Sequence, residues 1–220
     1  MKQLSKFVIL AVLACSSALA SDGDTYVHKV TITNITRGQT FTPVLVASHR
    51  AGITLFEAGA PANPEIEAMA ESGNIGPLKD LLGHMRGVYD ISDSGGLLFP
   101  GDSVTVTVRS KSGADRISLV GMLIPTNDSF VALNNVRASR NHRPVIYEAP
   151  AYDAGTETND ELCASIPGPV CGGAALSPDD DGEGYVHISA GIFGSGDLPE
   201  VADRDWRNPV AEISVRRVAK

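Results

Sequence analysis

The chain has 220 residues and a formal net charge of −8, because 26 Asp and Glu outnumber 18 Lys and Arg. Such an acidic chain repels phosphate backbones, and the sequence has no basic stripe with interleaved aromatic residues, which argues against nucleic acid as a partner. Beyond the N-terminus no apolar stretch approaches the roughly 20 residues of a transmembrane helix, so we expect no transmembrane segment.

The first 20 residues have the pattern of a secretory signal peptide. Lys2 and Lys6 provide a positive n-region, and residues 7–14 form a short apolar region. Residues 18–20 then form an A-x-A cleavage site. This pattern predicts export to a secreted or periplasmic location, and removal of the two lysines takes the net charge to −10.

A lipid anchor is an alternative interpretation of the same region. Residues 12–15 loosely resemble a lipobox, in which Cys15 would be lipidated and would become the mature N-terminus. Leu13 suits that motif poorly, so cleavage after Ala20 is the main interpretation. The remaining residues, 21–220, contain no internal repeat and no linker, and we expect them to form one domain.

Much of the mature sequence alternates between apolar and polar residues with a period of two. Val104, Val106 and Val108, for example, alternate with polar side chains directly after a Pro-Gly-Asp turn. One face of such a segment can be buried and the other hydrated. Short β-branched segments separated by Gly, Pro, Asn and Asp predict an all-β fold, an antiparallel β-sandwich. The predicted strands are residues 26–33, 104–109, 117–123, 185–189 and 211–216.

Two short helices are predicted in one region of the chain. Residues 64–70 begin with Pro64 at the first helical position, after Asn63 as the N-cap. Residues 76–82 form the second helix, which we expect to stop at Gly83. We expect this short helical insertion to pack across one end of a sheet.

Two cysteines, Cys163 and Cys171, remain in the expected mature chain. An even pair in an exported protein indicates one disulfide bond, which here would close residues 164–170 into a short loop with a Pro-Gly-Pro turn. A catalytic or metal-bound pair is the rival interpretation, but no histidine or third thiol is nearby in the sequence.

Three acidic residues stand out in the predicted loops. Asp128 follows a strand end, and Asp153 and Glu157 lie four residues apart around a glycine turn. Calcium is a hard cation that takes six to eight oxygen ligands at about 2.3–2.6 Å, and acidic residues on neighbouring loops can supply them. From composition alone, ordinary turn chemistry is the stronger interpretation of these residues.

Other chemical motifs in the chain are incomplete. The acidic run at residues 179–183 lacks the alternating ligands and the position-12 Glu of an EF-hand, so we interpret it as a hydrated turn. Residues 194–197 do not satisfy the G-x-S-x-G pattern of a nucleophile elbow. The five histidines show no zinc-binding spacing, and His28 and His187 are expected on strands with hydrogen-bond partners.

The order of several motifs resembles the spondin N-terminal domain, which is found in F-spondin, in mindin and in many bacterial secreted proteins. The resemblance rests first on two segments, residues 124–130 (IPTNDSF) and 150–157 (PAYDAGTE). Taken together, the motifs extend it over about residues 26–218. The segments that resemble the bacterial members are 182–188, 191–194 and 205–211.

The resemblance implies a C2-like β-sandwich with a calcium ion held at one end by loop carboxylates. The family's Pro-x-x-Asp loop matches Asp128, and its Asp-Ala-Gly-Thr-Asp turn matches Asp153 and, at its last acid, Glu157. These three residues are therefore the expected metal ligands. Glu157 replaces an Asp and has a longer arm. Ser129 replaces the Trp of the animal proteins, so the partners of the animal proteins are not carried over.

The sequence thus favours a calcium-stabilised binding module, not an enzyme, that acts in adhesion or ligand binding outside the cytoplasm. Its partner would be a protein or glycan that the sequence does not identify. The alternative is a periplasmic or secreted hydrolase with a site assembled from loops, although no nucleophile–base pair or zinc motif supports it. A structural envelope component, whose acids only keep it soluble, is the third hypothesis.

Overall fold

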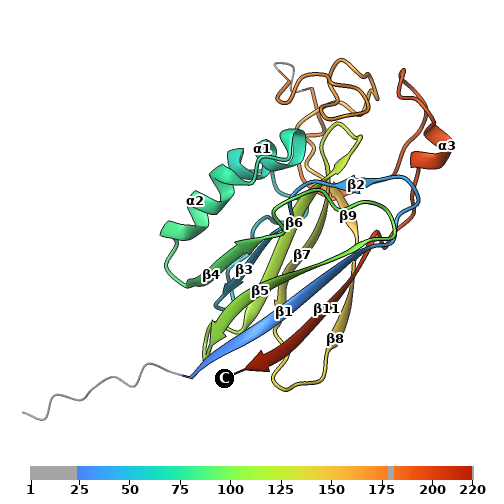
Figure 1. The fold of residues 1–220 in the computed structure, drawn as a ribbon. Helices are drawn as coiled ribbons and strands as arrows, with labels where there is room; N and C mark the ends of the chain where they lie inside the picture. Colours follow the sequence, from blue (N-terminus) through green and yellow to red (C-terminus); the bar gives the residue numbers. More distant parts are fainter. Residues whose placement is uncertain (1–23, 178–180, 220) are drawn as a thin grey trace, which may run out of the picture.

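A computed structural model describes residues 24–177 and 181–219 of the chain (Figure 1). The predicted signal peptide, the alternative lipid anchor at Cys15, and Asp179 and Asp180 of the acidic run lie outside the described residues. Within these two ranges, no helix is both long enough and apolar enough to cross a membrane.

Two antiparallel sheets make up most of the described structure, which confirms the predicted all-β sandwich. The smaller sheet has the strand order β5 (Ser103–Lys111), β1 (Thr25–Asn34), β11 (Ala211–Ala219) and β8 (Val145–Ala149). The larger sheet has the order β10 (His187–Ile188), β9 (Ala151–Asp153), β7 (Ser129–Arg137), β6 (Arg116–Ile124), β3 (Leu45–His49) and β4 (Val88–Asp93), and β2 (Thr40–Phe41) pairs with β6.

Alternate residues of the paired strands fill the space between the sheets. In β1, Val30 lies opposite Val215 of β11 and Val106 of β5, and all three side chains are buried. On the outer face, the hydroxyls of Thr31 and Thr105 are 2.8 Å apart and share a hydrogen bond. The period of two therefore places the valines in the core and the threonines towards water.

The central strand β6 is buried on both of its faces. Ile117, Leu119 and Leu123 belong to the core between the sheets, whereas Val120 and Met122 belong to a second core on the other side of the larger sheet. A strand that is covered on both faces needs a continuous apolar run. The sequence of β6 provides one.

The helical insertion packs on the outer face of the larger sheet and covers the second core. α1 (Pro64–Ser72) begins as predicted, because the Asn63 side chain accepts a hydrogen bond from the Ile66 amide at 2.8 Å. α2 (Gly76–His84) continues through the predicted stop at Gly83. Figure 1 shows both helices beside β4 and β6, on a face of the sheet instead of across its end. The fully buried helical side chains include Ile66, Met69, Leu78 and Leu82.

Two features of the strands differ from the prediction. The strand predicted at residues 185–189 shortens to β10, because Val186 is buried whereas Ile188 is 53% exposed, so the alternation does not continue. Strands β2, β3, β4, β7, β8 and β9 have no counterpart among the predicted strands. In β3 every residue is buried, which leaves no period of two to detect.

Cys163 and Cys171 form the predicted disulfide bond, with eight residues of sequence separation. The loop between them is anchored by the fully buried side chain of Ile166. The bond therefore closes a small unit that is packed onto the rest of the domain.

We expect replacement of both cysteines by alanine to lower the free energy of unfolding by about 2–3 kcal/mol, because the bridge restricts a short loop of the unfolded chain. Urea unfolding of the oxidised wild type and of the Cys163→Ala/Cys171→Ala variant measures the difference. Wild type in the presence of reductant should match the variant. An unchanged unfolding midpoint in the variant would contradict this expectation.

Candidate metal site

The acids predicted as metal ligands meet at one end of the larger sheet. Asp128 lies in the turn between β6 and β7, and Asp153 is the last residue of β9. The pairing of β7 with β9 places Ser129 opposite Asp153, and the Ala154 amide donates to the Asp128 carbonyl oxygen at 3.2 Å. Strand pairing therefore brings Asp128 and Asp153 side by side, although they are distant in the sequence.

A tight turn after β9 brings Glu157 to the same place. The Gly155 amide donates to Oδ1 of Asp153 at 2.9 Å, which starts the turn. The amides of Thr156 and Glu157 then donate to Oδ2 of Asp128 at 2.8 and 3.2 Å. One oxygen of Asp128 is thus held by the turn that carries Glu157.

Three carboxylate oxygens in this cluster have no hydrogen-bond partner. They are Oδ1 of Asp128 and both side-chain oxygens of Glu157, and they find no partner among the residues that the structure describes. The two residues are only 0% and 2% exposed, so bulk water does not reach them. The Ser177 backbone amide and the Asn127 side-chain amide lower the pKa of Glu157, but they donate their hydrogen bonds to Glu71 and Asp160, at 3.3 and 3.1 Å. Unpaired buried carboxylates are costly, and a bound cation would remove that cost.

Glu161, another buried acid of the same region, shows the contrasting case. Its carboxylate accepts hydrogen bonds from the amides of Phe193, Gly194 and Ser195, the last two at 2.6 and 2.9 Å. These bonds satisfy the charge and hold the 193–195 loop in place. Burial of an acid is therefore not sufficient evidence for an ion site. The unpaired oxygens of Asp128 and Glu157 are what single them out.

Burial and mutual repulsion raise the pKa values of the clustered acids. Burial first, and then the charge of Asp153, raise the pKa of Asp128 to about 7. Burial, followed by the charges of Glu71 and Asp128, raises the pKa of Glu157 to about 8. Burial also raises the pKa of Asp153, against the effect of its hydrogen bond from Asn159. Without a cation, the cluster therefore favours protons on its acids.

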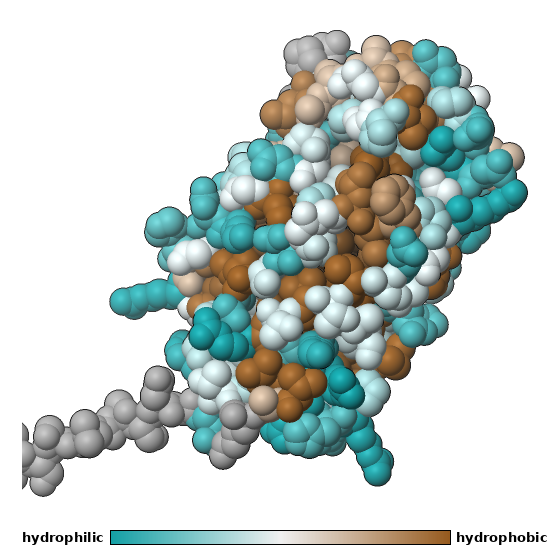
Figure 2. All heavy atoms as spheres, in the orientation of Figure 1, coloured by the Kyte–Doolittle hydropathy of each residue, from teal (hydrophilic) through white to brown (hydrophobic). Residues whose placement is uncertain are grey.

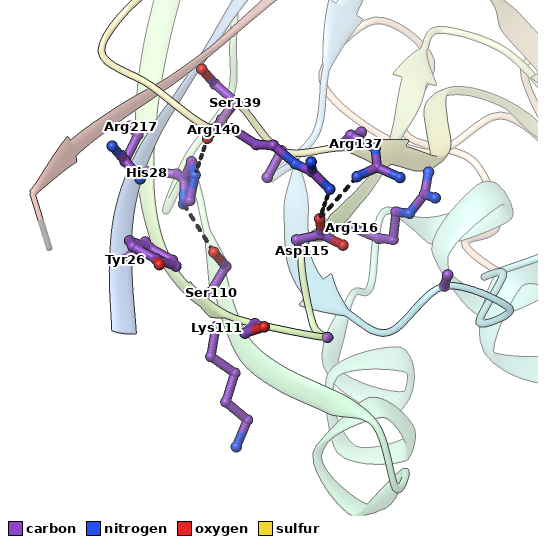
Figure 3. A pocket seen from close by; sticks show the side chains of 14 residues that line it. Tyr26, His28, Ser110, Lys111, Asp115, Arg116, Arg137, Ser139, Arg140 and Arg217 are labelled. Atoms are coloured by element: carbon purple, nitrogen blue, oxygen red, sulfur yellow. Dashed lines mark hydrogen bonds and ion pairs between the residues drawn. The ribbon is translucent and has the colours of Figure 1, made fainter. Parts of the chain in front are cut away.

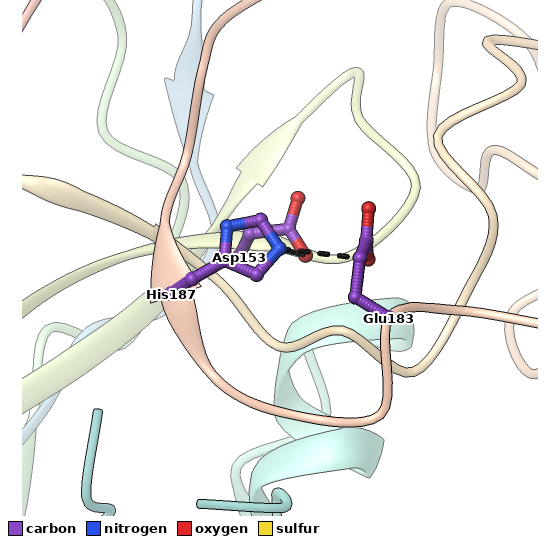
Figure 4. A group of neighbouring side chains, drawn as sticks. All are labelled: Asp153, Glu183 and His187. Atoms are coloured by element: carbon purple, nitrogen blue, oxygen red, sulfur yellow. Dashed lines mark ion pairs between the residues drawn. The ribbon is translucent and has the colours of Figure 1, made fainter. Parts of the chain in front are cut away.

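Glu183 and His187 flank Asp153 on its more exposed side (Figure 4). His187 lies opposite Asp153 in the β9–β10 pair, and its Nε2 atom is 3.5 Å from Oδ1 of Asp153 and 3.5 Å from Oε2 of Glu183. One ligand atom from each of the three residues falls within 4.8 Å of the others. Burial lowers the pKa of His187, but its hydrogen bond to the Ile188 carbonyl and the two carboxylates raise that pKa above its ordinary value.

Glu183 and His187 are functional candidates that the sequence analysis misses. Their approach to Asp153 depends on glycines that let two backbones touch. A Cβ atom at Gly155, where φ is +66°, would lie 2.3 Å from the Tyr185 carbonyl oxygen. The available sequence signal is the stretch Gly-Glu-Gly-Tyr-Val-His, in which a Cβ atom at Gly182 would lie 2.4 Å from the Gly155 carbonyl oxygen.

One group of side chains at this end has the spacing of a metal site, and it consists of Asp153, Glu183 and His187. Asp128, Asp153 and Glu157 offer only carboxylate oxygens, which a hard cation such as Ca²⁺ prefers, but Asp128 and Glu157 join no group of that spacing among the described residues. Asp153 with Glu183 and His187 adds an imidazole nitrogen, which suits a transition metal. Asp153 belongs to both groups, so an ion at either position engages it.

Comparison with protein-family models matches residues 28–162, more than half of the chain, to Spondin_N. No curated protein matches the chain. The matched segment contains all three predicted ligands but ends before Glu183 and His187. The family match and the disulfide bond together indicate an extracellular protein.

We expect the buried acids to make the metal-free protein less stable as the pH rises. In the unfolded chain, Asp128 and Glu157 titrate near their ordinary pKa values, around 4. In the folded protein these pKa values are about 7 and about 8. Between these limits the folded state binds more protons than the unfolded state, so the free energy of unfolding falls with rising pH.

Urea unfolding in EDTA between about pH 5 and pH 8 tests this expectation. The quantity to measure is the stability difference between wild type and the Asp128→Asn/Glu157→Gln variant. His28 and His49, whose pKa values are lowered mainly by burial, act in the opposite direction in both proteins and cancel in this difference. Wild type should lose stability relative to the variant as the pH rises. A constant difference would contradict the assignment of raised pKa values.

Proposed function

The chain belongs to the Spondin_N family, and from that premise we propose that it is an exported calcium-binding module. Asp128, Asp153 and Glu157 hold the ion at the loop end of the sandwich, which we define as residues 125–128, 154–177 and 181–198. This end binds a protein or glycan outside the cytoplasm, in adhesion or ligand capture and not in catalysis.

The observation that carries the proposal is the set of unpaired buried oxygens on Asp128 and Glu157. Together with Asp153 they come from two turns that are joined only by a few hydrogen bonds, such as the bond from Thr156 to Asp128. Calcium tolerates irregular shells of six to eight oxygens, whereas Mg²⁺ demands near-octahedral geometry and retains its waters. Turns of this kind therefore suit calcium better than magnesium.

Accessibility favours an ion site over a catalytic site. A raised pKa is also typical of catalytic acids, but a catalytic acid must reach its substrate. All three acids are at most 2% exposed. The neighbouring cavity of about 160 Å³ is lined by Gly155, Thr156, Gly184 and residues before α1 or within it, and by none of the three acids. An ion fits such an enclosed position, and a substrate does not.

The loop end also exposes apolar side chains that suit a binding partner. Phe193, Leu176 and Ile188 are 67%, 55% and 53% exposed. Figure 2 shows apolar residues among the loops at the top of the molecule. Exposed apolar side chains on the loops of an exported domain can contact a binding partner. Because Tyr185 packs on the turn that carries Glu157, an ion in that turn would help to position this surface.

We expect calcium to raise the unfolding temperature of the EDTA-treated mature protein. A ligand that binds only the native state adds about 2.7 kcal/mol at a hundredfold excess over Kd. Asp128→Asn and Glu157→Gln should each weaken calcium binding by roughly tenfold or more, because each keeps an oxygen but removes a charge. Differential scanning calorimetry measures the unfolding temperature, and isothermal titration calorimetry measures the calcium affinity.

Two variants serve as controls for the calcium titration. Glu212→Gln removes the same charge from an exposed position of β11 and should leave the affinity unchanged. His187→Gln should affect calcium binding less than either acid variant, whereas an ion held by Asp153, Glu183 and His187 would be lost. Absence of heat and of a thermal shift at millimolar calcium would remove the metal from the proposal.

We expect the partner of the loop end to bind in calcium and not in EDTA. Arrays of extracellular glycans and matrix proteins probe this with labelled protein. Phe193→Ser should abolish the calcium-dependent signal without changing calcium affinity, because it removes an exposed contact and no ligand. Ile146→Ser, at a 51% exposed apolar residue of β8, is the matched control and should bind normally. Equal binding in EDTA would contradict a calcium-ordered surface.

A further inference from the structure

A pocket of opposite charge lies at the other end of β6 from the metal site. It has a volume of about 510 Å³ and is lined by the β5–β6 turn, the segment that ends and follows β7, and the paired ends of β1 and β11 (Figure 3). Arg116, the first residue of β6, lines this pocket, whereas Asp128 follows the last residue by a short turn. The two ends of β6 are roughly 25 Å apart at about 3.3 Å per residue.

The lining concentrates positive charge in an acidic protein. The lining contains five of the chain's 18 Lys and Arg residues but only one of its 26 Asp and Glu residues. The cationic residues are Lys111, Arg116, Arg137, Arg140 and Arg217, and the acid is Asp115. We call this cavity the basic pocket. Like charges that gather in a hollow repel each other and raise the local concentration of anions.

Two of the arginines pair with the same carboxylate. Nη1 of Arg137 and Nη2 of Arg140 lie 3.4 and 3.5 Å from Oδ2 of Asp115. Figure 3 shows Arg116 beside them, whereas Lys111 points away. Nε of Arg116 is buried and has no hydrogen-bond partner among the described residues. One carboxylate cannot neutralise three guanidinium groups, so donors remain for a second oxyanion.

Arg217 of β11 adds positive charge to the lining and lies opposite His28 of β1. The Arg217 guanidinium lies over the Tyr26 ring at 5.0 Å, and its Nε has no hydrogen-bond partner in the described part of the chain. This guanidinium therefore adds to the positive potential that attracts an anion.

The rest of the lining is polar and held in place. The His28 ring bonds to the Ser139 carbonyl at 2.9 Å and lies 3.4 Å from the Ser110 hydroxyl. Ser112 and Tyr26 complete a wall of hydroxyl groups and one aromatic ring. A volume in this range accepts a small molecule and not only a single ion. The surroundings suit a ligand with hydroxyl groups in addition to its negative charge.

We propose that the basic pocket binds an acidic sugar, with Arg116, Arg137 and Arg140 holding its carboxylate, sulfate or phosphate group. The guanidinium groups supply paired N–H donors to the oxyanion. Ser112 and Tyr26, whose side chains carry hydroxyl groups, line the same pocket and would contact the hydroxyl groups of the sugar. This site shares no residue with the calcium site, and its occupancy does not depend on calcium.

Titrations with glucuronic acid, glucose 6-sulfate, glucose 6-phosphate and neutral glucose test the proposal. NMR amide shifts of the isotope-labelled mature protein are followed at constant ionic strength, which removes general screening. At least one acidic sugar should bind saturably and shift residues 110–116 and 137–140, and glucose should not. The acid that binds most tightly identifies the oxyanion. Shifts that are scattered over the surface, or equal for glucose, would overturn the proposal.

Variants that remove either positive or negative charge from the basic pocket provide a second test. Arg137→Gln/Arg140→Gln should weaken binding by at least roughly tenfold, the loss expected when charged hydrogen bonds are removed. Arg37→Gln/Arg207→Gln, which changes two exposed arginines that pair with aspartates elsewhere, should bind as wild type does. Asp115→Asn keeps the shape but removes the competing carboxylate, so it should bind more tightly than wild type. Equal affinities in both arginine variants, or no gain in Asp115→Asn, would contradict the assignment.

Discussion

The architecture depends on one strand, β6, which is apolar on both faces. Its inner residues, such as Leu119, close the core against the smaller sheet, and its outer residues, such as Met122, close the second core under α1 and α2. The same strand pairs with β3, β7 and β2. Its two ends carry Arg116 in the basic pocket and the turn with Asp128 in the metal site. A polar residue in the middle of β6 would therefore disturb two cores and the scaffold of both sites.

The buried carboxylates of the candidate metal site carry a desolvation cost that Glu161, at the same end of the sandwich, avoids. Glu161 is buried but saturated by three backbone amides, so it stabilises the fold. Asp128 and Glu157 are buried with unpaired oxygens, and their pKa values of about 7 and about 8 record that cost. A protein that needed only a stable loop could use the arrangement of Glu161 throughout. Retaining unpaired carboxylates makes sense when a cation occupies the space between them.

Sequence patterns predict the parts of this fold that are buried on one side. The alternation in β1, β5 and β11 and the Asn63 cap of α1 are local signals, and they are confirmed. β3 has no period because both faces are buried, and β9 has only three residues. The alternation at residues 185–189 predicts a longer strand than β10. At the site, the family resemblance supplies Asp128, Asp153 and Glu157. Glu183 and His187 become neighbours of Asp153 only through pairing between distant segments.

The candidate metal site and the basic pocket differ in how easily a ligand can reach them. At each end of β6, side chains of one sign are held close together, and a ligand of the opposite sign relieves the repulsion. The acids of the metal site are buried, so an ion there can exchange only when the loops around it open. The arginines of the basic pocket are accessible, with 46% and 72% of the Arg137 and Arg140 side chains exposed. An anion can therefore enter and leave without any change in the sheets. A cation bound at the proposed metal site would therefore be a lasting part of the domain's structure, and the proposed recognition of acidic sugars at the opposite end would be reversible.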